Sequence, residues 1–244
     1  MKYLKKFENH TAYEAAESGL ILPNVSLCVQ ENDVHYNPFV DPCQQYDYVE
    51  IGGIKWATKN VGACSVTDYG LYFQWGDTQG YAASEVGSGE GQKYFGWADY
   101  KYSNDDGSVM TKYNSTDGKT VLDASDDAAT VNMGSNWRMP TDAEFRVLGN
   151  AVNASYTNDY NGTGIGGIIC RASNGSGAEL FFPYAGSCVN GKTYIGSNGR
   201  CWSKTLTYNK DTAFKMIFGE SGIYWSNDQY NRSRGFSVRG VFIG

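Results

Sequence analysis

The sequence predicts an α+β protein in which two short helices accompany antiparallel strands and long loops. Aromatic residues make up 15% of the chain, glycines number 30 and charged residues account for only 19%, which is typical of a chain with many turns. Two helix-start signals lie near the middle, and short alternating segments bounded by Gly, Asn and Asp lie on both sides of them. With 244 residues and 41% hydrophobic content, the chain can form one large domain with a sizeable core and a small module.

Residues 1–45 are expected to form the small module. A capping box at residues 10–14 predicts a short helix, and two strands are expected after it, at residues 24–29 and 34–37. A helix and a hairpin of this size cannot hold themselves together, so the module must dock on a neighbour. A linker at residues 38–42 then leads to the main domain, residues 46–244.

The main domain is expected to open with a β-hairpin. Residues 49–51 and 54–57 alternate as strands, and Gly52 and Gly53 between them supply the turn. Residues 77–120 are rich in Gly, Ser, Asn and Asp with scattered aromatic residues. This composition predicts a long ordered loop instead of a regular element.

Thr141 and Glu144 mark the start of the clearest helix. Pro140 cannot continue a helix behind it, the Thr141 hydroxyl can accept from the amide three residues on, and Glu144 can reach back. The helix is expected to end between residues 150 and 153. Its apolar stripe is formed by Phe145, Val147, Leu148, Ala151 and Val152.

A second helix start is predicted just upstream. Ser125 is followed by Asp126 and Asp127, and acidic side chains are favourable near the N-terminus of a helix. Gly134 is expected to stop this helix.

Strands are expected to dominate the second half of the chain. Residues 153–167 predict a second long loop, and three strands are expected around turns, at residues 168–172, 179–183 and 200–203. A strand at residues 213–218 would send Phe214, Met216 and Phe218 into the core, and Ala213, Lys215 and Ile217 to the other face. In the closing strand, Phe236, Val238 and Phe242 share a face in the same way.

Residues 219–234, between these two strands, show no hydrophobic period but carry many aromatic and small polar side chains. Tyr and Trp give contact area at little entropic cost, whereas Ser and Asn adapt to different partners. Held by a rigid sheet, this segment is predicted to form a binding surface.

Six stretches of the main domain together resemble a known family. Residues 122–132 are followed by residues 136–145, which read Asn-Trp-Arg-Met-Pro-Thr-Asp-Ala-Glu-Phe, and the other four lie at residues 54–63, 72–77, 181–186 and 234–241. They resemble FISUMP-type domains, which belong to the C-type-lectin-like folds alongside the formylglycine-generating-enzyme-like group. The resemblance spans residues 46–244 in the right order and implies a C-type-lectin-like domain.

Residues 201–203, 213–214 and 234–239 are similar to the frame of the C-terminal variable region of retroelement-diversified proteins, in which adenine-directed mutagenesis rewrites Asn-type codons. The similarity implies a ligand-binding region at about residues 201–239. Its varied contact positions would be Thr205, Thr207, Tyr208, Lys215, Ile217, Tyr224, Ser226, Asp228, Tyr230 and Ser233, with Trp225 as a further ligand-binding residue. Lys215 departs from the pattern, because an Asn codon changed only at its adenines cannot encode Lys. The alternative is that these are ordinary loop residues of an undiversified domain.

Residues 3–7, 23–26 and 34–38 resemble a leader that recurs at the start of structural and tail proteins of phages infecting gut Bacteroidetes. This resemblance implies attachment or homo-oligomerisation through the N-terminal module; the alternative is an edge hairpin of the main sheet. Residues 1–10 contain no hydrophobic segment for a secretion signal. The expected location is the virion, as part of a phage tail made in the bacterial cytoplasm.

Charge and composition argue against nucleic acid and membrane partners. The net charge is −6 without a cluster of Lys and Arg, and no apolar run approaches the length of a membrane span. His10 and His35 are the only histidines and lie in the small module, so the main domain can assemble neither a Ser-His-Asp arrangement nor a His-based metal site. The G-x-G-x-x-G match at residues 162–167 precedes a strand, which favours a turn over a dinucleotide site.

No metal or other cofactor is expected. The calcium candidates, residues 104–107 and the group Asp123, Asp126 and Asp127, are better explained by a polar turn and a helix start. The six cysteines are far apart and without a C-x-x-C pair, at positions 28, 43, 64, 170, 188 and 201. Without an export signal, free buried thiols are favoured over a Cys170–Cys188 or Cys188–Cys201 disulfide.

Together these observations predict a non-enzymatic ligand-binding protein, the receptor-recognition part of a phage or prophage tail, whose partner is a bacterial surface protein or glycan. The second hypothesis is a bacterial FISUMP-type surface or structural protein without a diversified site. The third is an oxidase of the formylglycine-generating type, which would work through a cysteine pair such as Cys188 and Cys201.

Overall fold

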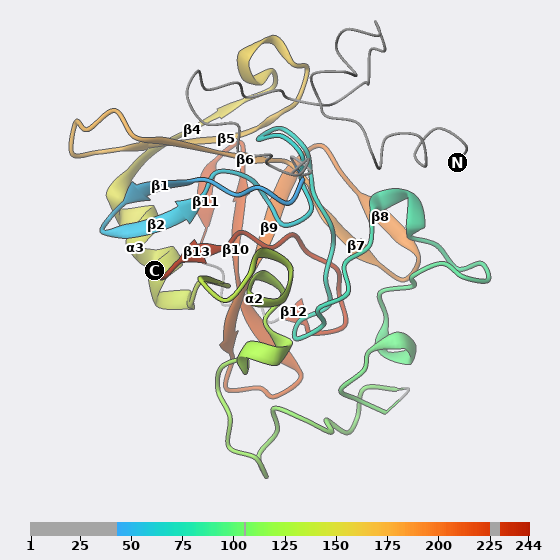
Figure 1. Ribbon diagram of the computed structural model, residues 1–244. Helices are drawn as coiled ribbons and strands as arrows, with labels where there is room; N and C mark the ends of the chain where they lie inside the picture. The colour runs from blue at the N-terminus through green and yellow to red at the C-terminus, as the bar shows by residue number, and fades with distance from the viewer. Residues whose placement is uncertain (1–42, 105, 225–229) are drawn as a thin grey trace, which may run out of the picture. The chain divides into compact units, whose positions relative to one another are not determined.

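The computed structural model describes residues 43–244, with the exception of residues 105 and 225–229 (Figure 1). The chain divides into two units, Met1–Asp41 and Pro42–Gly244, and all described residues belong to the second. The helix and the two strands expected within residues 1–45 therefore lie outside the described residues.

The second unit is α+β, with antiparallel sheets and few helices, as the sequence predicts. Its first sheet has the order β1 (Tyr48–Ile51), β2 (Ile54–Ala57), β13 (Val241–Phe242), β3 (Trp137–Arg138). The hairpin at the start of the domain is confirmed, and Gly52 and Gly53 both have positive φ in its turn. Because β13 pairs with β2, the two ends of the domain lie side by side.

Helix α3 (Asp142–Ala151) begins at the predicted capping box. The Thr141 hydroxyl accepts from the Glu144 amide at 3.2 Å, and the Glu144 carboxylate accepts from the Thr141 amide at 2.7 Å. Phe145 and Leu148 are buried. The predicted stripe was too wide, because Val147 is 40% exposed and Val152 already begins the next strand.

Helix α2 (Ala128–Met133) ends at Gly134 as predicted, but it does not begin at Ser125. Ser125 lies in a short 3-10 turn, η4 (Ala124–Asp126), and Asp127 is the N-cap residue. Its carboxylate accepts from the amides of Ala129 and Thr130 at 3.1 and 3.0 Å. A carboxylate and a hydroxyl are equally good caps, so the sequence could not decide between the two positions.

The second sheet has the order β4 (Val152–Thr157), β5 (Gly167–Ala172), β6 (Glu179–Pro183). Strands β5 and β6 agree with prediction, whereas the loop predicted at residues 153–167 is wrong, since its first part is β4. Residues Asn153 to Tyr156 are exposed on this strand, which hides the alternation that a half-buried strand would show. The glycines at residues 162–167 lie between the turn η5 (Tyr160–Gly162) and β5, as expected for a turn.

The third sheet is built on β10 (Thr212–Gly219), which pairs with β9 (Asn198–Leu206), β11 (Gly222–Tyr224) and β12 (Tyr230–Asn231). A small hairpin of β7 (Ser187–Val189) and β8 (Lys192–Tyr194) precedes it. The register with β9 shifts between Ala213 and Lys215, as at a β-bulge. Met216 and Phe218 are buried as predicted, but the predicted alternation is wrong at the shift: Phe214 is only half-buried, and Lys215 is 3% exposed.

The closing segment is only partly a strand. Phe236 and Val238 are fully buried as predicted, but Phe236 is held by an isolated bridge to Phe73, and the regular strand is limited to β13. Phe242 does not join them in the core; it is half-buried and stacks on Tyr48 at 5.1 Å.

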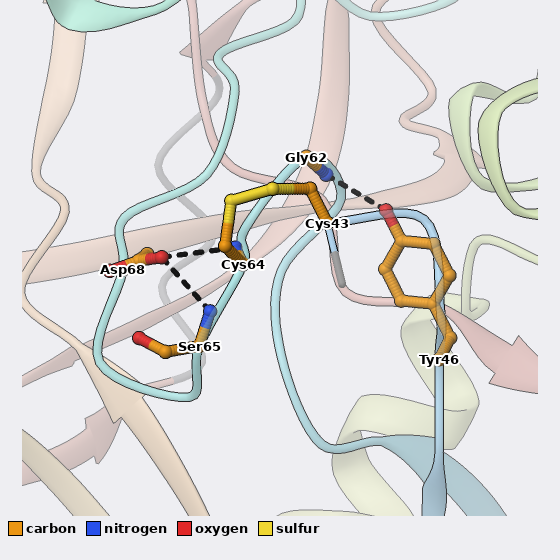
Figure 2. The surroundings of a disulfide bond; sticks show 6 residues. All are labelled: Cys43, Tyr46, Gly62, Cys64, Ser65 and Asp68. Atoms are coloured by element: carbon orange, nitrogen blue, oxygen red, sulfur yellow. Dashed lines mark hydrogen bonds between the residues drawn. A yellow bond between two sulfur atoms is a disulfide. The ribbon is translucent and has the colours of Figure 1, made fainter. Parts of the chain in front are cut away.

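The disulfide Cys43–Cys64 corrects the expectation of free thiols at these positions (Figure 2). The link joins residues 21 positions apart, on either side of the β1–β2 hairpin, which brings the chain back on itself. The Tyr46 hydroxyl accepts from the Gly62 amide at 2.9 Å in the same region. Cys170, Cys188 and Cys201 are free and buried, as expected.

The described residues of the 77–120 segment form an ordered loop, as predicted, which includes the 3-10 turns η2 (Ala83–Glu85) and η3 (Trp97–Asp99). Asp99 accepts from the amides of Tyr94, Phe95 and Gly96. Burial opposes ionisation of Asp99, but these donors and Lys93 outweigh it and lower its pKa. Among the described residues, no helix has the length and apolar content to span a membrane.

Candidate ligand-binding site

Strand β10 is the central strand of the sheet in which contact residues were expected (Figure 1). Near its end, Ile217 pairs with Arg200 of β9 on one side and with Tyr224 of β11 on the other. Near its start, Ala213 pairs with Leu206 of β9 and with Tyr230 of β12. Strand β9 thus flanks one edge of β10, while β11 and β12 pair with the other edge.

The turn between β9 and β10 presents Tyr208, which is 82% exposed. Thr207 beside it is buried, and its hydroxyl donates to the Asn209 carbonyl at 2.8 Å and contacts the Thr212 hydroxyl. Thr212 also donates to the Asn209 carbonyl, at 3.0 Å. Thr207 therefore fixes the turn, whereas Tyr208 projects from it.

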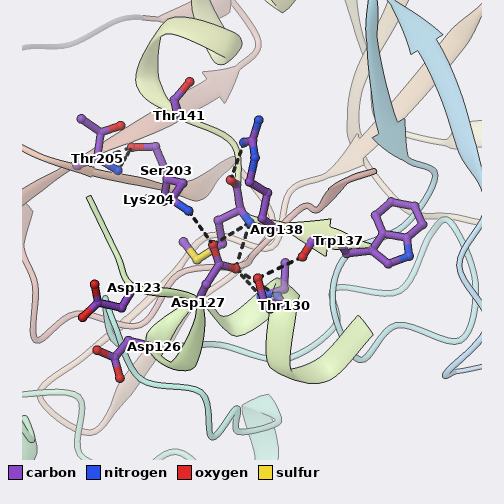
Figure 3. A network of polar contacts seen from close by, with 12 residues as sticks. Asp123, Asp126, Asp127, Thr130, Trp137, Arg138, Thr141, Ser203, Lys204 and Thr205 are labelled. Atoms are coloured by element: carbon purple, nitrogen blue, oxygen red, sulfur yellow. Dashed lines mark hydrogen bonds and ion pairs between the residues drawn. The ribbon is translucent and has the colours of Figure 1, made fainter. Parts of the chain in front are cut away.

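Thr205 lies on β9, half-buried, and its hydroxyl accepts from the Asp142 amide at 3.2 Å, at the start of α3. Figure 3 shows the polar network next to it, which is centred on the fully buried Asp127. The Asp127 carboxylate accepts from the Met139 amide at 2.9 Å and pairs with the Lys204 ammonium at 3.5 Å. These contacts tie β9 to α2, α3 and β3, so the strand that carries Thr205 is held in place.

Ile217 and Tyr224 form a second group, toward the other end of β10. Ile217 is half-buried and Tyr224 is 40% exposed. Ile217 lies five positions after Thr212 on β10, which is about 17 Å at about 3.3 Å per residue. The expected contact positions therefore divide between two ends of the strand instead of forming one small cluster.

Several expected positions do not offer their side chains to solvent. Lys215, which pairs with Trp202, and Ser233 are each 3% exposed. The Ser233 carbonyl accepts from the Gln74 side chain at 2.8 Å. Trp225, Ser226 and Asp228 lie outside the described residues, and for Tyr230 only the backbone pairing is described.

Arg232 belongs to the segment predicted to form the binding surface, residues 219–234, but its side chain is buried and packs beneath this region. Its guanidinium is fully buried, 5.4 Å from the Trp75 ring and 5.5 Å from the Tyr100 ring. Nη1 donates to the carbonyls of Lys112 and Tyr113, at 3.2 and 3.3 Å, and burial lowers the Arg232 pKa. No local pattern distinguishes it from an exposed loop arginine, because its partners come from the distant 77–120 loop.

Comparisons with protein-family models, with curated proteins and with solved structures found no match for this chain. In the part of the chain that the structure describes, no group of three His, Cys, Asp or Glu side chains could hold a metal ion. Of the acidic calcium candidates, Asp127 caps α2 and Asp126 accepts from Lys112 and Tyr113.

The two cysteines considered for oxidase chemistry are both buried and not bonded to each other. Burial raises the pKa of Cys188 and of Cys201 to about 12, so both thiols are protonated at neutral pH. Because the thiolate is the reactive form, this environment gives no support to a nucleophilic pair. The arrangement around β10 is instead suited to non-covalent contact through exposed aromatic side chains on a fixed sheet.

Proposed function

We propose that this chain is a non-enzymatic ligand-binding protein with a C-type-lectin-like domain, and that it contacts its partner through the β9–β12 sheet and its turns. The observation that carries the proposal is the exposure of Tyr208, in the turn between β9 and β10, and of Tyr224, on β11, at 82% and 40%. Aromatic side chains on a rigid frame provide contact area without a large loss of entropy on binding. Thr205 and Ile217, both half-buried, complete the set of accessible positions.

The setting that we propose is the receptor-recognition part of a phage or prophage tail, with a bacterial surface protein or glycan as the partner. Support comes from the motif order of residues 46–244 and from the leader-like segment near the N-terminus. In this proposal the N-terminal module attaches or oligomerises the protein, and the C-terminal region is diversified. A bacterial FISUMP-type surface or structural protein is the second candidate, because it shares the same main-domain motifs. Tail genes and a reverse transcriptase beside the gene would favour the first candidate, and a polysaccharide or outer-membrane locus the second.

The test is binding of the full chain to intact bacterial cells and to a glycan panel, with variants at the exposed tyrosines. Tyr208→Ala and Tyr224→Ala should each weaken binding about tenfold or more if these rings are central contacts. Tyr94→Ala is the matched control, because Tyr94 is 38% exposed but lies in the 77–120 loop. Equal binding by all four proteins would refute the proposed face.

A further inference from the structure

The turn between β5 and β6 contains an Asn-Gly pair, and the chain has others. Asn is followed by Gly at residues 161, 174, 190 and 198. This dipeptide is chemically labile, because glycine has no side chain to keep its own amide nitrogen away from the preceding Asn side chain, whose carboxamide carbon that nitrogen can attack. The pairs differ in their surroundings, and the surroundings decide which of them can react.

Asn174 and Gly175 lie in an exposed turn with open space around them. Residues 173–177 are all exposed, and a Cβ atom on Gly175 would meet no other atom within 4 Å. Among the described residues, no group accepts a hydrogen bond from the Gly175 amide. The nitrogen that would attack the Asn174 side chain is therefore not held by any other contact.

The same turn also polarises the group that is attacked. The Ser176 amide donates to Oδ1 of Asn174 at 3.0 Å. Negative charge develops on this oxygen when a nucleophile adds to the carboxamide carbon, and a donor that is already in place stabilises it. Asn161 is exposed as well, but no described backbone amide donates to its side-chain oxygen. Asn174 thus combines an unengaged nucleophile with an activated carboxamide.

The Asn190–Gly191 pair is held by the 77–120 loop. Asn190 is exposed, but the Gly191 amide donates to the Tyr94 carbonyl at 2.6 Å. The Asn190 amide donates to the Phe95 carbonyl at 3.3 Å. Attack by the Gly191 nitrogen would have to break its hydrogen bond, so this pair should react slowly in the folded protein.

The Asn198–Gly199 pair is part of strand β9. Oδ1 of Asn198 accepts from the Arg200 guanidinium at 2.6 Å, so this carboxamide is polarised too. Gly199 is buried, however, and pairs with Phe218, whose ring would lie 2.1 Å from a Cβ atom at this position. The Asn198 carbonyl accepts from the Gly186 amide at 2.9 Å. The backbone is therefore fixed, and the Gly199 nitrogen cannot turn toward the side chain.

We propose that Asn174 is a modification site at which the folded chain converts its own asparagine to aspartate and isoaspartate. The Gly175 amide gives its proton to hydroxide, and its nitrogen forms a bond to Cγ of Asn174. The bond from Cγ to Nδ2 then breaks, and ammonia leaves with a proton from water. Water adds to either carbonyl of the cyclic succinimide and opens the ring. Nothing is oxidised or reduced, and water is the co-reactant.

The modification changes the charge of a turn without removing its hydrogen bond. A neutral carboxamide becomes a carboxylate, which can still accept from the Ser176 amide. The isoaspartate product also adds a methylene group to the backbone, for which an exposed turn has room. None of the expected ligand-contact positions lies in this turn, so the inference goes beyond the proposed binding function and does not depend on it.

The test is peptide mapping of the full chain by mass spectrometry after incubation in warm, mildly alkaline buffer, with a matched sample unfolded in urea. In the folded chain Asn174 should convert about tenfold or more faster than Asn190 and Asn198, because their glycine nitrogens are held. In urea all the Asn-Gly pairs should convert at similar rates, because the surroundings that distinguish them are gone. A rise in pH should speed the conversion of Asn174, because the attacking nitrogen must lose its proton.

A pair of variants tests the part played by the Ser176 amide. Ser176→Pro removes this donor and should slow the conversion of Asn174 about tenfold, whereas Ser176→Ala keeps the donor and should keep the rate. Equal rates in the two variants would contradict activation by the amide. The proposal as a whole would be overturned if Asn174 stayed intact while another asparagine reacted, or if the folded and unfolded chains reacted in the same order and at the same rates. This ranking is measured in the wild type, so it holds whether or not the Pro variant folds.

Discussion

Removal of the Cys43–Cys64 disulfide should destabilise the domain by an amount that follows from the length of the loop it closes. The two cysteines are 21 residues apart, and the loop contains the whole β1–β2 hairpin. The chain-entropy relation for a loop of this length gives about 3 kcal/mol at 25 °C. We therefore expect the Cys43→Ser/Cys64→Ser variant to have a free energy of unfolding about 3 kcal/mol below that of the wild type.

The measurement is urea unfolding of the full chain, followed by tryptophan fluorescence. With a denaturant dependence of about 2–3 kcal/mol per molar, the loss corresponds to a midpoint lower by about 1–1.5 M. The double substitution removes neither the Tyr46–Gly62 nor the Asp68–Cys64 hydrogen bond, because their donors are the backbone amides of residues 62 and 64 and their acceptors are the Tyr46 and Asp68 side chains. A loss much larger than 3 kcal/mol would show that those contacts depend on the link.

The control is a reductant. It should lower the midpoint of the wild type to that of the double variant and leave the double variant unchanged. Our reasoning would be refuted if the wild type and the double variant unfolded at the same urea concentration under oxidising conditions. Disulfides persist where thiols are not kept reduced, so an intact link in purified virions would agree with the phage-tail location that we propose.

Three further predictions concern the frame of the domain. Thr141→Ala removes the N-cap of α3 and should cost about 1 kcal/mol in urea unfolding, whereas the exposed Arg146→Ala should stay within about 0.5 kcal/mol. Burial disfavours the ionised Glu144 carboxylate, but Arg138 and Thr141 outweigh burial and lower the Glu144 pKa. The stability that the ionised carboxylate adds is therefore present above the ordinary pKa of Glu and is lost as the pH falls. Glu144→Gln should flatten the decline in stability between about pH 5 and pH 3, and an unchanged slope would contradict this assignment. Arg239→Met leaves the Asn60 side chain and the carbonyls of Ala57 and Phe181 without their donor and should cost at least about 3 kcal/mol; a fully stable variant would show that these groups find other partners.

The parts of the fold that the sequence predicted well depend on local signals. The capping box at Thr141 and Glu144 and the turn at Gly52 and Gly53 act within a few residues, so their structure is encoded where it forms. The missed strand β4 depends on its pairing with β5, and its exposed polar residues carry no local sign of that pairing. The disulfide was missed for the same reason, because its two cysteines meet only after the hairpin has formed.

In the candidate site, too, local features could be predicted from the sequence, whereas contacts between distant residues could not. Composition alone indicated that the last part of the chain carries aromatic residues, and the structure places Tyr208 and Tyr224 at the surface. Composition could not indicate that a register shift buries Lys215, nor that Arg232 turns inward against Trp75. Each depends on which residue faces a strand or loop that is distant in sequence, and the residues next to Lys215 and Arg232 in the sequence do not contain that information.

Burial also limits which positions of a diversified region could vary. Replacement of exposed residues such as Tyr208 usually changes stability by less than about 0.5 kcal/mol, whereas Thr207 and Ser233 are buried and hydrogen-bonded in the frame. If the region is diversified, replacements among sibling genes should therefore concentrate at Tyr208, Tyr224 and their accessible neighbours. Lys215 should stay constant because it is buried, and an Asn codon changed only at its adenines cannot have produced it. Replacements at Lys215 or Thr207 as frequent as those at Tyr208 would contradict this separation of frame and contact surface.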